Sequence, residues 1–235
     1  MEMKKILIIL ILNFYICSEK VEFNVSMYGL PMANVSIKFD DILFDNKNAI
    51  KLSFNTHTNK IASKIFKVNN SYITVIEKKT YDILSYEKKT IQPGLENIIK
   101  TNLDNGQVRY LNGEYIIPKN YFNIFSLLYY LSKTSYNQVK EKVKLEREGL
   151  IYDCLIKKEV EDTNYIYNLE FIKIDNQNIP VIENTDIFTW AVFKDNSKKS
   201  IIVNKDSLSI TSCNFKIGLT NVKAKKMNVK EKGLF

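Results

Sequence analysis

Apolar and polar residues alternate along most of this chain, and the alternation predicts β-strands. Within residues 21–27 and 33–39, every second side chain is apolar and those between are polar. This period of two is typical of a strand with one buried face. A break around Gly29 and Pro31 separates the two runs, so residues 21–39 predict a β-hairpin.

Further apolar or alternating runs predict strands through the rest of the chain. Turn dipeptides such as Asn105-Gly106 separate them, and no repeat or linker interrupts the series. In one run, Val143 and Leu145 are predicted to face inward and Glu146 outward. Strands joined by short connections predict one antiparallel β domain over residues 19–235. The other predicted strands cover residues 50–54, 65–68, 72–76, 81–89, 98–101, 107–111, 139–146, 151–160, 165–171, 187–193, 200–204, 207–217 and 219–227.

The segment from Pro118 to Lys133 differs, because its apolar residues recur at three- and four-residue steps. This spacing predicts a helix at about residues 120–132, with Asn120 as its N-cap. The helix is apolar on nearly all sides, so most of its surface must be buried. A sheet of this many strands is expected to curl. The predicted fold is therefore mostly β: a single curved antiparallel sheet, forming a half-barrel or open barrel, wrapped around this one apolar helix.

Two surfaces inside the predicted fold are candidates for ligand contact. Asn123, Ser126 and Tyr130 form a thin polar stripe on the helix, which is predicted to be the side that faces water or a ligand. The concave face of the sheet is predicted to be apolar, and it either packs on the helix as core or leaves an apolar cavity beside it. Its side chains are Phe23, Val25, Val35, Ile37, Leu52, Phe54, Tyr167, Leu169 and Phe171.

The first 18 residues have the three parts of a secretory signal peptide. Lys4 and Lys5 give a positive start, residues 6–16 form an apolar run, and Ser18 is a small residue suited to cleavage. The run is shorter than the roughly 20 residues that a membrane-spanning helix needs. Export, in particular to the periplasm, is therefore expected. A buried N-terminal strand or helix is the alternative interpretation.

The three cysteines leave further alternatives open. Lipid anchoring through Cys17 is a minority alternative to plain cleavage, because bulky residues, rather than small ones, precede it. After cleavage, Cys154 and Cys213 either pair as a disulfide in an oxidising compartment or remain small buried thiols. The cysteines have no metal-ligand spacing.

The formal net charge of +8 raises the question of a nucleic-acid partner. Nearly all of the positive charge comes from lysine, because Arg109 and Arg147 are the only arginines. Arginine is the preferred residue for bidentate recognition of phosphate, and an excess of one charge also serves solubility. No nucleic-acid partner is expected.

The sequence contains no recognisable catalytic constellation. Its one histidine, His57, lies at a predicted strand edge without a nucleophile or an orienting carboxylate in an identifiable pattern. No nucleophile elbow or Gly-rich phosphate loop is present. The acidic groups at residues 40–41 and 159–162 fall where strands turn, and acidic residues are common in turns. A non-enzymatic protein without cofactor or metal is therefore expected.

Three features together resemble a known family. They are the hairpin around Tyr28-Gly29-Leu30-Pro31, the segment 63–72, and the helical pattern Ile-Phe-Ser-Leu-Leu-Tyr-Tyr-Leu at residues 124–131. This order of elements resembles a family of exported bacterial proteins catalogued as domain of unknown function 3108, over most of residues 21–226. Members tend to carry Asp, Arg and Pro in a late turn; here Asp195 is present, but residues 198–200 are Lys-Lys-Ser. The resemblance implies export and this architecture, and no established activity.

Three functional hypotheses follow. The first is an exported cell-envelope protein that acts as a non-enzymatic binding or assembly module. The second, by analogy of fold with periplasmic lipoprotein carriers, is a carrier of a lipid-like apolar ligand. The third is an enzyme acting on envelope glycans, for which a solvent-facing cleft with two convergent carboxylates would be the distinguishing feature. The expected partner is an apolar ligand or an envelope component.

Overall fold

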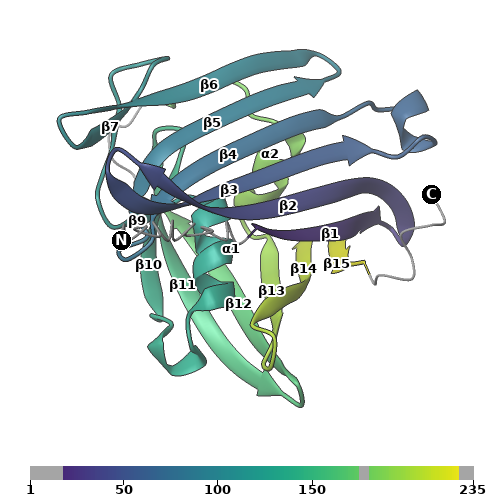
Figure 1. Cartoon of the computed structure of the whole chain (residues 1–235). Coiled ribbons are helices and arrows are strands. Elements are labelled where there is room, and N and C mark those ends of the chain that lie inside the picture. The colour runs from purple at the N-terminus through teal and green to yellow at the C-terminus, as the bar shows by residue number, and fades with distance from the viewer. Residues whose placement is uncertain (1–17, 175–179, 228–235) are drawn as a thin grey trace, which may run out of the picture.

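The computed structural model describes residues 18–174 and 180–227, which form a nearly closed β-barrel with a helix inside it (Figure 1). The mostly β prediction is confirmed, and the sheet curls further toward closure than a half-barrel. The described residues form fifteen strands of one sheet. Their bounds are β1 (Ser18–Met27), β2 (Leu30–Phe44), β3 (Lys47–Thr58), β4 (Asn69–Glu77), β5 (Ile83–Gln92), β6 (Leu95–Asp104), β7 (Gln107–Tyr110), β8 (Ile116–Ile117), β9 (Tyr121–Phe122), β10 (Lys142–Arg147), β11 (Leu150–Glu161), β12 (Asn164–Lys173), β13 (Lys198–Asn204), β14 (Ser209–Ile217) and β15 (Thr220–Lys226).

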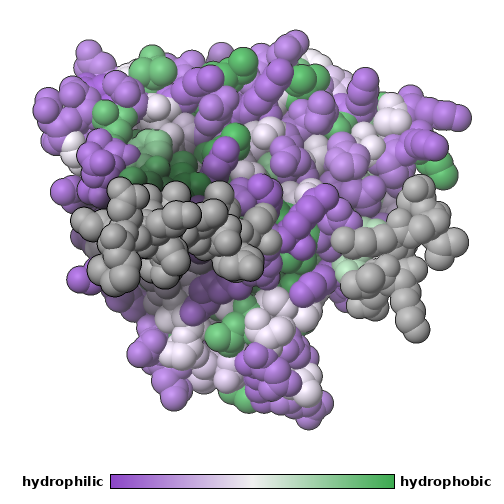
Figure 2. Space-filling view, in the orientation of Figure 1, coloured by the Kyte–Doolittle hydropathy of each residue, from purple (hydrophilic) through white to green (hydrophobic). Residues whose placement is uncertain are grey.

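The strand order is β8-β7-β6-β5-β4-β3-β2-β1-β15-β14-β13-β12-β11-β10-β9. Neighbouring strands are antiparallel, except that β9 runs parallel to β10. Strand β1 pairs with both β2 and β15, so the two ends of the described chain meet in the middle of the sheet. The short strands β8 and β9 are its two edges. Hydrophilic side chains dominate the barrel face seen in Figure 2, as expected for antiparallel strands that bury only one side.

The inward positions of the strands agree with the predicted alternation. In β3, for example, Ile50, Leu52 and Phe54 are all buried, as expected from the sequence. Full burial of one such side chain contributes about 1.5–3 kcal/mol to folding. The repeated alternation is therefore sufficient to fix which face of each strand points into the barrel.

Helix α1 (Ile124–Lys133) lies inside the barrel and contacts β3, β4, β10 and β14 (Figure 1). Most of its residues are buried, which confirms the predicted helix wrapped by a sheet. Its predicted start is wrong. Asn120 adopts a left-handed φ of 63°, and Tyr121 and Phe122 are extended because they pair with β10. The helix therefore begins at Ile124, with Asn123 as its N-cap.

Three further predictions are wrong. Residues 187–193 form helix α2 (Ile187–Phe193), not a strand, because the Asp186 carboxylate accepts hydrogen bonds from the first amides of the helix. Residues 65–68 are not a strand either, since a 3₁₀ turn (Ala62–Lys64) and irregular backbone lead into β4. Glu146 does not face outward but is buried, next to the equally buried Leu145.

Residues 1–17, which include most of the predicted signal peptide and Cys17, lie outside the described residues. Ser18 is the first residue of β1. Within the described part of the chain, none of the helices has the length and apolar character to cross a membrane.

Candidate functional site

An apolar cavity lies inside the barrel, between the two helices and the middle of the sheet. Its volume is about 290 Å³. Phe125 and Leu128 reach it from α1, and Ile187 and Val192 reach it from α2. Side chains from β1, β2, β3, β14 and β15 supply most of the remaining wall.

The wall of the cavity carries few polar groups. Among the lining residues, Asn70 has the most polar side chain, and its amide is already bonded on both sides. Its Nδ2 donates to the Tyr72 hydroxyl at 3.1 Å, and its Oδ1 accepts from the amide of Ile91 at 3.1 Å. A polar ligand buried there would lack partners for its own polar atoms, so the wall fits an apolar ligand.

The size of the cavity fits one small apolar molecule or one segment of a longer chain. A cavity of about 150 Å³ lined by Leu, Ile and Phe stays dry and binds benzene. Pockets for drug-sized ligands span about 300–1,000 Å³. The cavity lies between these sizes, close to the lower bound for drug-sized ligands.

The cavity reaches the surface at one end of the barrel. Met27, Met32 and Phe66 line it and are half-buried, at the end of β1, the start of β2 and in the β3–β4 connection. Ile187 lines it as well and is 45% exposed. An apolar ligand therefore has a route from the surface to the cavity.

The predicted concave face divides into cavity wall and plain core. The residues that line the cavity are Phe23, Val25, Val35, Ile37 and Phe54. Leu52, Tyr167 and Leu169 are buried away from the cavity, and the Phe171 ring packs against that of Phe193 at 5.1 Å. The predicted concave face is therefore plain core at some of these residues and the wall of an apolar cavity at the others.

The predicted polar stripe on α1 is not part of the cavity wall. Asn123 and Ser126 form a capping box, in which each side chain accepts a hydrogen bond from the other residue's amide at 2.9 Å. The Asn123 Nδ2 also donates to Thr74 Oγ1 at 2.9 Å. The Tyr130 hydroxyl bonds backbone atoms of residues 138 and 140. All three residues are thus engaged within the fold, and a ligand-facing role for them remains a prediction.

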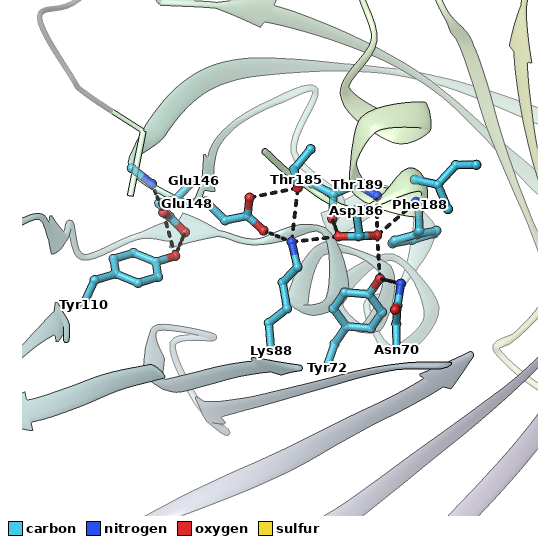
Figure 3. Close-up of polar contacts among 12 residues, drawn as sticks. Asn70, Tyr72, Lys88, Tyr110, Glu146, Glu148, Thr185, Asp186, Phe188 and Thr189 are labelled. Carbon is cyan, nitrogen blue, oxygen red and sulfur yellow. Dashed lines mark hydrogen bonds and ion pairs between the residues drawn. The ribbon is translucent and has the colours of Figure 1, made fainter. Parts of the chain in front are cut away.

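A buried ionic cluster of Lys88, Glu148 and Asp186 lies next to the cavity (Figure 3). The Lys88 ammonium lies between the two carboxylates, bonding Glu148 Oε1 and, at 2.7 Å, Asp186 Oδ2. The three side chains are 0%, 3% and 0% exposed. Thr185 bridges the group, donating to Glu148 Oε2 at 2.9 Å and accepting from Lys88 at 3.1 Å. Buried charges are tolerated only when paired in this way.

Asp186 is the most heavily bonded member of the ionic cluster. Its Oδ1 accepts from the Tyr72 hydroxyl at 2.6 Å and from the amides of Phe188 and Thr189. Burial alone would raise the pKa of Asp186, but the Lys88 ammonium and these donors outweigh burial and hold the pKa below its usual range. Burial and the Asp186 carboxylate raise the pKa of Tyr72 well above its usual value, so its hydroxyl remains a donor.

Glu146 is a third buried carboxylate, beside the two of the ionic cluster. Its oxygens accept from the Tyr110 hydroxyl at 2.9 and 3.0 Å and from the amide of Gly149 at 2.8 Å. Burial raises the pKa of Glu146 to about 7, although these hydrogen bonds act in the opposite direction. The folded protein therefore keeps the neutral form of Glu146 to a higher pH than an exposed glutamate would.

The polar groups around the ionic cluster have little room for a substrate. The space beside Glu146, Glu148 and Thr189 is only about 10 Å³, at the lower bound for one water molecule. Across residues 18–174 and 180–227, His, Cys, Asp and Glu side chains form no group of three that could hold a metal ion. His57 is exposed at the end of β3. The ionic cluster therefore has a structural role, because it connects α2 and the β10–β11 turn to the sheet.

Cys154 and Cys213 are both free thiols and both buried, so the buried-thiol alternative is correct in this structure. Burial raises the pKa of each to about 12. Cys213 lines the cavity. A thiol with so high a pKa is a poor nucleophile, and it acts there as a small apolar side chain.

Neither α2 nor the ionic cluster was predicted from the sequence. A usable signal existed for Lys88, because alternation from Tyr86 to Thr90 places it on the inward face of β5. For α2, Asp186 belongs to the residue types preferred at a helix N-cap. No such local signal marked Glu148, which lies in a turn.

Comparison with known proteins adds information about the fold alone. The sequence matches no family model and no curated protein. The structure is similar to the crystal structure of a beta-barrel-like protein of domain of unknown function DUF1849 from Brucella abortus. That match has a TM-score of 0.51 and 9% sequence identity, and covers 91% of this chain and 96% of the other. The chain therefore shares a β-barrel-like fold with this protein of unknown function.

Proposed function

We propose that this protein is an exported, non-enzymatic binding protein that holds a lipid-like apolar ligand inside its barrel. The observation that carries the proposal is the apolar cavity of about 290 Å³ beside α1 and α2. Pockets that are concave, apolar and open at one end are the usual form of ligand sites. Removing the ligand's apolar surface from water would drive the binding.

The ionic cluster does not favour the alternative of an envelope-glycan enzyme. That activity needs two carboxylates at a cleft open to a sugar. Glu148 and Asp186 converge, but on the buried Lys88 and not on solvent. The cluster supports ligand binding indirectly, because it fixes α2, which forms part of the cavity wall.

Export is the second part of the proposal. It is supported by the signal-like residues 1–18 and by the resemblance to domain of unknown function 3108, whose members are exported. A protein in the periplasm that holds an apolar molecule would act as a carrier or an assembly module for envelope lipids.

Two measurements test the ligand site. Native mass spectrometry of protein taken from the cell envelope should show an apolar adduct that organic extraction removes. The stripped protein should then bind the neutral dye phenylnaphthylamine, with energy transfer from Trp190, the single tryptophan, which lies on α2. Absence of both the adduct and saturable dye binding would refute the proposal.

A further inference from the structure

Three turns meet at the end of the barrel where the cavity reaches the surface. The turns lie in residues 28–32, 59–68 and 217–223, and together these residues are called the rim. The first two of the three turns are at the right of Figure 1. The backbone N–H of Asn59 donates to the Met32 carbonyl at 3.0 Å, and the hydroxyls of Tyr28 and Thr220 bond at 2.8 Å. The rim is therefore one continuous surface beside the cavity opening.

The rim exposes large apolar side chains to solvent. Ile61, Ile65 and Leu219 are 78%, 87% and 93% exposed, and Tyr28 and Leu30 are also exposed. A single exposed apolar residue is ordinary, but five on three adjoining turns form a patch of the kind that marks interaction sites.

The rim is also strongly basic. No Asp or Glu occurs in residues 28–32, 59–68 or 214–227. Within the described residues, the exposed lysines of the rim make no ion pair. They are Lys60, Lys64, Lys67 and Lys223, with Lys216 next to them. Apolar tips among unpaired lysines match the chemistry of an anionic lipid surface.

We infer that the rim docks on the surface of an anionic phospholipid bilayer, with the cavity opening turned toward the membrane. The apolar tips enter the boundary of headgroups and acyl chains, and the lysines bind the phosphates. A second copy of this chain is a poor occupant, because its rim would bring the same positive charge. Met27, Met32 and Phe66 line the cavity next to the rim, so a docked molecule would place its opening at the lipid.

Vesicle flotation tests this inference independently of the proposed ligand. Protein starting at Ser18 lacks the apolar run at 6–16 and contains every described element, and circular dichroism verifies that it folds. This protein should float with vesicles that contain phosphatidylglycerol and much less with pure phosphatidylcholine. Binding of phenylnaphthylamine to the cavity is measured in a separate assay. A negative result in one assay therefore does not decide the proposal that the other assay tests.

Charge variants test the role of the rim lysines. Substituting Lys60, Lys64 and Lys67 by glutamine should weaken binding to the anionic vesicles, by about fivefold for each lysine. The matched control carries the same substitution at three exposed lysines at the other end of the barrel and should bind as the parent does. These are Lys47, Lys79 and Lys119.

Apolar variants test insertion, with circular dichroism to verify folding. The serine triple variant of Ile61, Ile65 and Leu219 should lose most vesicle binding and keep dye binding. Serine at Leu43 and Leu111, which are 70% and 64% exposed away from the rim, should change neither. Equal losses in the rim and control variants, or no binding to anionic vesicles, would overturn the inference. So would a dimer in sedimentation velocity that only the rim variants dissociate, since it would assign the rim to a second copy.

Discussion

The Tyr72 hydroxyl on β4 donates a 2.6 Å hydrogen bond to the Asp186 carboxylate at the start of α2. This bond connects the cavity to the ionic cluster, because Tyr72 lines the cavity and Asp186 pairs with Lys88. The ring of Tyr72 also packs on Phe125 of α1, with centroids 4.7 Å apart. Both helices that shape the cavity are thus fixed to one strand by a single side chain.

Removal of the Lys88 charge is expected to destabilise the fold strongly. Lys88→Met leaves the carboxylates of Glu148 and Asp186 buried without a cation, at a cost of about 3–5 kcal/mol. Tyr72→Phe removes two hydrogen bonds, the one donated to Asp186 and the one accepted from Asn70, and should cost about 2–4 kcal/mol. Urea denaturation measures both. The control Lys89→Met changes the exposed neighbour on the outer face of β5 and should leave the midpoint unchanged. Equal midpoints for the two Met variants would contradict the role of Lys88.

The strands and the central helix were predictable because both rest on periodic patterns. Ile50, Leu52 and Phe54 alternate with polar residues, which favours a strand. Packing of their side chains inside the barrel stabilises the same conformation. The segment 187–193 has β-branched and aromatic residues that favour a strand. It forms a helix because Asp186 caps it and the ionic cluster holds that cap in place, a tertiary effect that overrides propensity.

The candidate site was predictable only in its apolar half. Phe23, Val35 and Phe54 were expected on the concave face and do line the cavity. The buried charges come from β5, the β10–β11 turn and the segment before α2, which are far apart in sequence. A lysine is almost never fully buried unless paired, and the sequence does not reveal that Glu148 would lie beside Lys88.

Glu146 should make the stability depend on pH. Burial raises its pKa from 4.5 to about 7, so between these values the folded protein holds a proton that the unfolded chain has released. The contribution of Glu146 to the free energy of unfolding is therefore largest below pH 4.5. It decreases as the pH rises from 4.5 to 7 and does not change further above pH 7. At about 1.4 kcal/mol per pKa unit, the loss is about 3 kcal/mol.

The variant Glu146→Gln isolates this dependence. Its stability relative to the parent should rise by about 3 kcal/mol from below pH 4.5 to above pH 7, in urea titrations across that range. Glu96→Gln on the exposed face of β6 is the control and should track the parent at every pH. A constant difference between Glu146→Gln and the parent would show that Glu146 ionises normally in the fold.

The capping box of α1 should matter for stability and not for ligand affinity. Asn123→Ala removes the N-cap and the bond to Thr74, and should cost about 1–2 kcal/mol. Because Asn123 is not part of the cavity wall, affinity for phenylnaphthylamine should be unchanged. Thermal unfolding and dye titration on the same samples measure the two effects. A large fall in dye affinity in the folded variant would instead support the ligand-facing role predicted from the sequence.

Filling the cavity should abolish dye binding without unfolding the barrel. Ala224 on β15 lines the cavity, so Ala224→Phe places a ring in the space that the dye would occupy. Dye affinity should fall at least about tenfold, and the unfolding midpoint should fall little, because the added ring enters open space instead of packed core. Lys225→Phe adds the same ring at the next, exposed position of β15 and should leave dye affinity unchanged. If Ala224→Phe folds and still binds the dye as tightly as the parent, the dye binds elsewhere and the cavity is not the ligand site.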